Sequence, residues 1–213
     1  MKKIPILLTA LGLSSCSAWV FAEADAERGA ASAAMCMACH QADGGGMNIA
    51  GGESWPRLAG LSATYISKQL HDYKSGARSN ASMIPFASML DEQQIEDVAA
   101  YYASLPATQG KGSEGADEAT LNRGQQLAER GDWSAYIVSC KSCHGPDSQG
   151  AGGDFPGISG QHAGYIEAQL QAWKAGNRKN DTQDLMGSIA RRMSDDDIHA
   201  VAVWLASQSP AGN

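Results

Sequence analysis

Apolar residues recur with a helical period near the end of each half of the chain, which predicts a helix in both places. The positions with this spacing are Ile95, Val98, Ala99 and Tyr102 in the first half, and Ile198, Val201, Ala202 and Leu205 in the second. Asp91 stands just before the first stripe, where its carboxylate can cap the helix. Ser194 stands before the second and is followed three residues later by Asp197, the spacing of a capping box.

The rest of each half also reads as helical. A middle helix is expected from about Tyr65 to Gly76 and from about Tyr165 to Gly176, because glycine commonly ends a helix. A first helix is expected to precede and include residues 36–40 in one half and 140–144 in the other. No segment alternates apolar and polar residues as a strand does, so the predicted fold class is all-α.

The two halves are copies of one another, since three blocks recur in the same order. These blocks are CMACH and CKSCH, the stretches beginning WPRLAG and FPGISG, and the stretches beginning MIPF and MGSI. We therefore expect two tandem domains, 23–107 and 120–213. Residues 108–119 between them are rich in glycine and polar residues, and are expected to form a linker.

The first 22 residues have the pattern of a signal peptide. Lys2 and Lys3 precede a short apolar stretch, and Ala22 ends a cleavage-like sequence. Leu13 to Cys16 also resembles a bacterial lipoprotein box, although the residues after Cys16 stay apolar. We expect an exported periplasmic protein that is soluble in preference to lipid-anchored at Cys16.

Composition narrows the function further. The chain has 213 residues, of which 43% are hydrophobic, so two domains can each bury a core. Its formal net charge of −7 argues against nucleic acid as a partner, because phosphates would repel it. No segment of the mature chain is apolar enough to span a membrane.

The pattern CxxCH, present once in each half, is the attachment signature of c-type haem. Cysteines three apart on a helical turn share a face, so both sulfurs can form thioether bonds to one haem, and the next histidine can reach its iron. The predicted thioether residues are Cys36, Cys39, Cys140 and Cys143, and the predicted histidine ligands are His40 and His144. A four-cysteine zinc site or two disulfides are the alternatives, but neither needs a histidine after each pair. Two covalent haem c groups are thus expected.

The repeat also selects the second axial ligand. Of the eight methionines, only Met83 and Met186 match each other across the two copies, which predicts them as iron ligands. Core packing is the ordinary alternative for a methionine. The remaining histidines, His71, His162 and His199, are replaced by other residues in the opposite copy, so we expect them on helix surfaces or in solvent.

Several matched residues have weaker predicted roles. Pro56 and Pro156 each offer a carbonyl that could orient the neighbouring histidine ligand, although a structural turn is an equal alternative. The aromatic pair Tyr73 and Trp173 and the basic pair Arg78 and Arg178 could lie near the haem or meet its propionates, with ordinary core or surface roles as the alternative.

These motifs resemble the cytochrome c4 family, bacterial periplasmic proteins built from two fused class I cytochrome c domains. The resemblance covers nearly the whole mature chain and rests on both CxxCH motifs, the repeated middle blocks and the methionine before each last helix. It implies haem propionate edges that face each other between the domains. Residues 132–138 (DWSAYIV) depart from the repeat, because the first half lacks them, and they could alter the partner surface.

Three functions compete. Two irons with both axial positions filled favour an electron carrier between respiratory complexes or to a terminal oxidase. An electron acceptor or subunit of a periplasmic sulfide, thiosulfate or alcohol dehydrogenase is the alternative, with the same sites but another redox partner. A two-haem peroxidase is the third, and it would need an iron without its methionine. We expect a protein that is not itself an enzyme.

Overall fold

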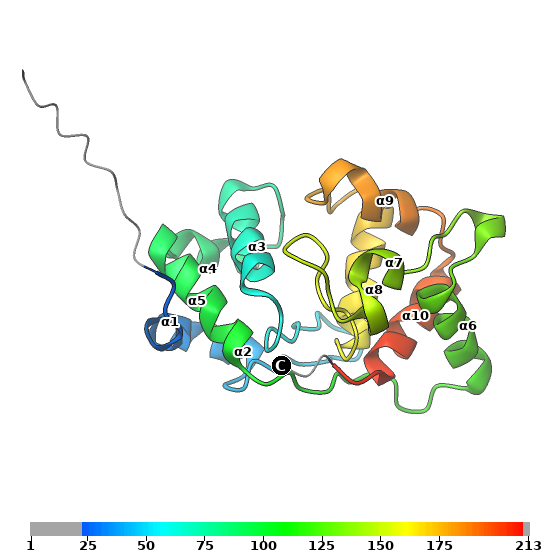
Figure 1. The fold of residues 1–213 in the computed structure, drawn as a ribbon, viewed down its shortest axis with the longest axis horizontal. Coiled ribbons are helices and arrows are strands. Elements are labelled where there is room, and N and C mark those ends of the chain that lie inside the picture. Colours follow the sequence, from blue (N-terminus) through cyan, green and yellow to red (C-terminus); the bar gives the residue numbers. More distant parts are fainter. Residues whose placement is uncertain (1–22, 211–213) are drawn as a thin grey trace, which may run out of the picture.

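The computed structural model describes residues 23–210, which fold into two helical halves lying side by side (Figure 1). The first half contains α1 (Ala26–Ser32), α2 (Met37–His40), α3 (Ala63–Ser75), α4 (Met83–Met89) and α5 (Glu92–Ser104). The second contains α6 (Glu118–Glu129), α7 (Lys141–His144), α8 (Ala163–Lys174), α9 (Leu185–Ala190) and α10 (Asp195–Ser207). Within residues 23–210 there is no β-strand, and backbone pairing between extended residues is limited to isolated β-bridges. The all-α prediction is therefore confirmed.

The last helix of each half is capped as predicted. In α5 the Asp91 carboxylate accepts the Gln94 N–H at 2.8 Å, and the Gln94 side chain accepts the Asp91 N–H at 3.0 Å. Ser194 and Asp197 exchange the same two bonds at the start of α10. Satisfying these otherwise unpaired N–H groups fixes where each helix begins.

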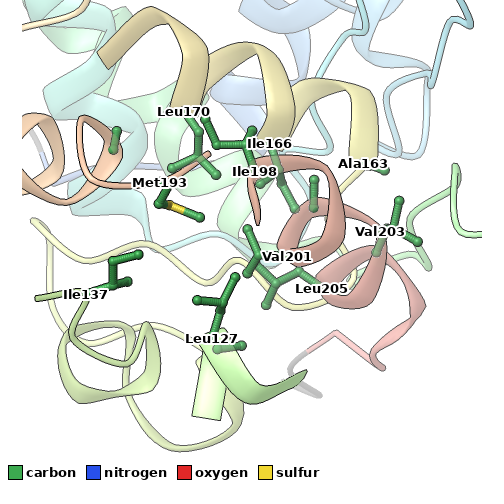
Figure 2. Close-up of a cluster of buried hydrophobic side chains, with 14 residues drawn as sticks. Leu127, Ile137, Ala163, Ile166, Leu170, Met193, Ile198, Val201, Val203 and Leu205 are labelled. Carbon is green, nitrogen blue, oxygen red and sulfur yellow. The ribbon is translucent and has the colours of Figure 1, made fainter. Parts of the chain in front are cut away.

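The two halves have separate apolar cores. Figure 2 shows the second core, in which Val201 and Leu205 of α10 lie near Leu127 of α6, with Ile166 of α8 beside Ile198. Val203 and Ala206 of α10 are buried as well, so this helix is covered on more than the predicted stripe. The first core is formed mainly by α3 and α5, with the addition of residues from α4 and Ala33.

A glycine permits the close crossing of the first and last long helices in each half. A Cβ added to Gly29 of α1 would lie 1.9 Å from the Asp97 carbonyl oxygen in α5. A Cβ added to Gly124 of α6 would lie 2.2 Å from the Ala200 carbonyl oxygen in α10. Only a residue without a side chain fits at these two positions.

An ion pair joins the same helices in both halves. Arg28 Nε donates to Asp97 Oδ2 at 2.8 Å, and Arg123 Nε donates to Asp197 Oδ1 at 2.7 Å. The hydrogen bond from Arg28 lowers the pKa of Asp97 to about 2. The two acids are not matched positions, because Asp97 corresponds to Ala200 and Asp197 to Gln94 in the repeat, so each half joins these helices through its own carboxylate.

The predicted ends of the middle helices are confirmed. Gly76, with φ +82°, closes α3 in the left-handed conformation that glycine adopts without strain. Gly176 has φ +72° and follows Ala175 at the end of α8.

The prediction of one continuous first helix through each CxxCH is wrong. α1 ends at Ser32, and a 3-10 turn over Ala33–Met35 separates it from α2. α6 ends at Glu129, and the residues unique to the second half then form a separate turn before α7. In that turn Asp132 pairs with Ile137 in a β-bridge, and its carboxylate accepts the N–H of Ser134 at 3.1 Å. The local hydrogen bonds of Asp132 compete with helix continuation.

The stretch between the halves runs along the second half. Gln109 Nε2 donates to the carbonyl oxygens of Ala206 and Gln208 at 2.7 and 2.9 Å, and α6 already begins at Glu118. The last two residues of the predicted linker, 118 and 119, are therefore helical. No helix within residues 23–210 has the length and apolarity to cross a membrane. The predicted signal peptide, with Cys16, lies outside the described residues, as do residues 211–213.

Candidate functional site

Each CxxCH motif forms one helical turn that presents a buried histidine. In α2 the His40 N–H donates to the Cys36 carbonyl at 2.9 Å, and in α7 the His144 N–H donates to the Cys140 carbonyl at 2.9 Å. The two histidines are 5% and 8% exposed. The tight turn places both cysteines of a pair and the histidine on one side of the backbone.

A proline carbonyl orients each histidine, as the matched prolines suggested. Nδ1 of His40 lies 2.9 Å from the Pro56 oxygen, and Nδ1 of His144 lies 2.7 Å from the Pro156 oxygen. Because a carbonyl oxygen can only accept, Nδ1 carries the proton in both rings, and Nε2 keeps its lone pair.

Burial sets the charge of these two rings. It lowers the pKa of His40 and of His144, and the proline carbonyl opposes this shift only in part. Both imidazoles are therefore neutral near pH 7, which is the form that binds a metal. In the described residues, Nε2 of neither ring takes part in a hydrogen bond.

The cysteine and the methionine predicted for each iron pack against the same apolar core. Cys36 and Met83 lie against the first core, and Cys140 and Met186 against the second. Burial raises the pKa of the Cys140 thiol to about 11 and also raises that of Cys36. A flat apolar group with one thioether-linked edge and an iron suits a site with this lining, so the residues fit a c-type haem.

Within residues 23–210, the four cysteines of the two motifs form no disulfide with one another, and each is partly exposed. Within residues 23–210, no cluster of three or more histidine, cysteine or acidic side chains could hold a metal ion. The structure thus keeps the two cysteine pairs apart in separate halves.

The comparison with known families decides the identity. The model described as cytochrome c matches residues 26–106 and again residues 121–209, one match per half. The chain belongs to the cytochrome c family.

Individual relatives show which cytochromes this chain resembles. It is 49% identical over 180 residues to the thiosulfate dehydrogenase electron acceptor of Stutzerimonas stutzeri (strain A1501), which covers 84% of this chain and 82% of that protein. The crystal structure of reduced recombinant cytochrome c4 from Pseudomonas stutzeri matches with a TM-score of 0.78 and 33% identity, over 87% of this chain and 100% of that one. The thiosulfate dehydrogenase TsdBA from Marichromatium purpuratum matches with a TM-score of 0.79 and 38% identity, over 86% of this chain but only 40% of that longer one.

These matches confirm the main predictions. The chain is a cytochrome c4-like electron-transfer protein with two class I-type cytochrome domains and one covalently bound haem c in each. Its relatives are electron-transfer cytochromes, and some act as electron acceptors.

Sequence reasoning missed a buried contact between the two halves of this cytochrome. Arg57 is 2% exposed, and its guanidinium donates to the backbone oxygens of Gly160, Ser159 and Ala59. Gln161 closes the contact, since its side chain accepts the Arg57 N–H at 2.8 Å and donates to the Arg57 carbonyl at 2.9 Å. Burial lowers the pKa of Arg57 to about 10. Arg57 occurs only in the first half and Gln161 only in the second, and neither is repeated in the other copy. Comparing the two copies therefore gives no signal for this contact.

The prediction that His162 lies at the surface is wrong, whereas His71 and His199 are exposed as expected. His162 is 3% exposed and lies between the halves. Its Nδ1 accepts the Lys111 N–H at 3.0 Å, and its Nε2 lies 2.8 Å from the Gly45 oxygen. The matched residue Ser62 instead caps α3, because the interface uses the two copies unequally.

Proposed function

We propose that each iron of this protein is held between a histidine and a methionine. His40 and Met83 would bind the first iron, and His144 and Met186 the second. The thioether bonds would form at Cys36, Cys39, Cys140 and Cys143. The support is geometric, because a motif cysteine and the candidate methionine pack against one core in each half, and Nε2 of each motif histidine makes no hydrogen bond in the described residues.

Hydrogen bonds with neighbouring residues fix the position of each proposed axial ligand. The proline carbonyl fixes each imidazole and makes its Nε2 a better donor to a metal. On the other side, the Met83 N–H donates to Asn80 Oδ1 and the Met186 N–H donates to Asp181 Oδ2, both at 2.8 Å. These bonds anchor the backbone from which each thioether extends.

A bound haem supplies a reversible one-electron couple. Thioether ligation favours the reduced iron and so raises the potential over that of two nitrogen ligands. With both axial positions filled, a substrate finds no open iron, which supports a carrier of electrons over a peroxidase. We propose that the protein itself is not an enzyme.

We infer that its electrons come from a thiosulfate dehydrogenase. The observation that carries this inference is the 49% identity to a protein named as the electron acceptor of that enzyme. A carrier to respiratory complexes or a terminal oxidase is the second candidate, favoured by the relatives named cytochrome c4. We also propose that residues 1–22 are removed and that the mature protein acts in the periplasm. Its measured mass would reveal the cleavage point, any lipid on Cys16 and the haem count together.

Reduction by a thiosulfate dehydrogenase tests the proposal. The oxidised holoprotein is mixed with purified enzyme and thiosulfate, and haem reduction is followed by absorbance, with enzyme or thiosulfate omitted as controls. Fast reduction of both haems only in the complete mixture is expected. A protein that stays oxidised there, yet is reduced by a quinol-oxidising membrane complex, would favour the respiratory carrier instead.

A further inference from the structure

The last helices of the two halves differ at one matched and buried position. Tyr102 of α5 and Leu205 of α10 are each 1% exposed. The Gly60 N–H donates to the Tyr102 carbonyl at 3.1 Å. The Gly160 N–H donates to the Leu205 carbonyl at 2.8 Å, so the two residues occupy equivalent places in the fold. At this position the first half therefore has a buried hydroxyl that the second half lacks.

Within residues 23–210 the Tyr102 hydroxyl has no hydrogen-bond partner. Its ring is closely packed, since the Tyr101 ring centre lies 5.0 Å from that of Tyr102, and a Cβ added to Gly44 would lie 3.1 Å from Tyr102 Cδ1. The hydroxyl cannot turn out to water unless the core opens. A buried O–H normally bonds to an acceptor, because an unpaired polar group away from water costs free energy. An acceptor is therefore expected next to Tyr102 Oη in the holoprotein.

Cys36, the first cysteine of the first CxxCH motif, is the neighbour that can supply this acceptor. It packs against the core to which Tyr102 belongs. Burial raises the pKa of Cys36, and the Tyr102 hydroxyl opposes that shift, because an O–H directed at sulfur stabilises a negative charge there. A thioether sulfur has no hydrogen and can only accept. Tyr102 is thus placed to donate to this sulfur once it is bonded to haem.

The corresponding cysteine of the second half has no such donor. Cys140 Sγ lies 4.0 Å from the Leu127 carbonyl oxygen, which accepts hydrogen bonds and cannot donate one. Figure 2 shows Leu205 among the apolar side chains of the second core, near Leu127 and Val201. A thioether at Cys140 therefore has an apolar neighbour where a thioether at Cys36 has a hydroxyl.

We propose that Tyr102 Oη donates a hydrogen bond to the thioether sulfur of Cys36 and thereby raises the reduction potential of the first haem alone. A donor draws electron density from the sulfur and from the porphyrin bonded to it, which favours the reduced iron. Because burial raises the pKa of Tyr102, the hydroxyl keeps its proton near neutral pH, and its effect is constant there. This inference rests on the proposed thioether bond at Cys36 but not on the methionine ligands.

Redox titration of the Tyr102→Phe holoprotein tests the proposal, since phenylalanine keeps the ring and removes only the hydroxyl. At a fixed applied potential, the ratio of reduced to oxidised first haem should fall about threefold, because one hydrogen bond that favours the reduced state is lost. The second haem should keep its wild-type ratio. NMR contacts between the wild-type Tyr102 ring and haem protons identify the first haem.

Tyr101→Phe is the matched control on the same helix. The Tyr101 hydroxyl donates to the Ala42 carbonyl at 3.5 Å in an exposed contact, so its removal should leave both haems at their wild-type ratios. An equal change in the control and in Tyr102→Phe would overturn the proposal.

Resonance Raman spectroscopy of the same samples reports on the thioether directly. The carbon–sulfur stretching band of the first haem should shift in Tyr102→Phe and stay in place in Tyr101→Phe. Wild-type potentials in Tyr102→Phe, an equal fall at both haems, or an unchanged carbon–sulfur band would each overturn the proposal.

The pyridine haemochrome spectrum of the wild type counts the thioether bonds of the haems. A missing bond at Cys36 would refute the proposed haem attachment before any tyrosine variant is made. Unchanged potentials in Tyr102→Phe with every thioether bond intact would refute only the role of Tyr102.

Discussion

At the scale of single residues, chemically identical side chains have separate roles that the repeat distinguishes. Met83 and Met89 lie on the same short helix, α4, but Met83 packs against the first core whereas Met89 is 57% exposed. Met193, which has no methionine partner in the other copy, is buried in the second core, as a packing residue should be. Matching across the copies thus separates a candidate ligand from ordinary methionines better than burial alone.

Replacing Met83 by Ala should lower the potential of the first haem and open its iron, because a soft thioether that favours the reduced state is lost. The ferric protein should lose the first haem's share of the methionine-to-iron charge-transfer absorption, while the second haem keeps its share through Met186, and the reduced protein should bind carbon monoxide. Met89→Ala is the control on the same helix and should leave both properties unchanged. An unaltered spectrum and titration in Met83→Ala would show that another residue binds this iron.

Not every residue of the site could be found from the sequence. The prolines that orient His40 and His144 could be named as candidates because they are matched and have a free carbonyl, but the sequence left a structural turn as an equal alternative. Arg57 and His162 lie at the interface in one copy only, so they look like ordinary substitutions. Comparing the two copies identifies residues that both halves use in the same way. It does not identify residues at the interface between the halves, because these differ between the copies.

At the scale of helices, the sequence predicted where helices begin and end better than how they pack across one another. The capping boxes of α5 and α10 and the glycine that closes α3 act within a few residues, so the sequence contains them in full. The breaks between α1 and α2 and between α6 and α7 depend on turns with no periodic signal. The crossing of α1 over α5 depends on residues far apart in the chain.

Gly29→Ala should destabilise the protein by about 3 kcal/mol or more, because its Cβ would overlap the Asp97 carbonyl of a packed helix and the backbone must move. Gly51→Ala is the matched control: Gly51 has φ +71° with no atom within 4 Å of its added Cβ. The control should cost only about 1 kcal/mol of backbone strain. Thermal unfolding of the two holoproteins measures the difference, and equal stabilities would mean that α1 is not tightly packed on α5.

At the scale of the whole molecule, the two halves are joined mainly by buried polar contacts instead of a shared apolar core. The two core clusters have no residue in common. Hydrogen bonds connect the halves instead, and they involve Arg57, Gln161, His162 and Arg78. Buried polar contacts need their partners in one protonation state, because an unsatisfied buried group costs about 1–3 kcal/mol. The attachment of the halves should therefore respond to pH more than the fold of either half does.

His162 is the group through which that response should act. Burial lowers its pKa below 6.5, and the nearby charges of Arg57 and Lys111 lower it further, while Glu114 is the facing acid. Its folded pKa is lower than its unfolded pKa, so its stabilising contribution is complete above about pH 6.5 and is lost as the pH falls through the folded value. Protonation would place a second N–H against the Lys111 N–H, which cannot accept it.

Acidification from about pH 7.5 to about pH 5 should therefore loosen the two halves of the wild-type protein, costing about 1–3 kcal/mol. Small-angle scattering should show a larger radius of gyration, with both haem spectra retained. His162→Gln has no titrating ring, so its interface should be weaker at neutral pH but nearly independent of pH over this range. The exposed His71 and His199 are present in both proteins and cancel in the comparison. If the variant expands on acidification as much as the wild type, the pH response belongs to other groups.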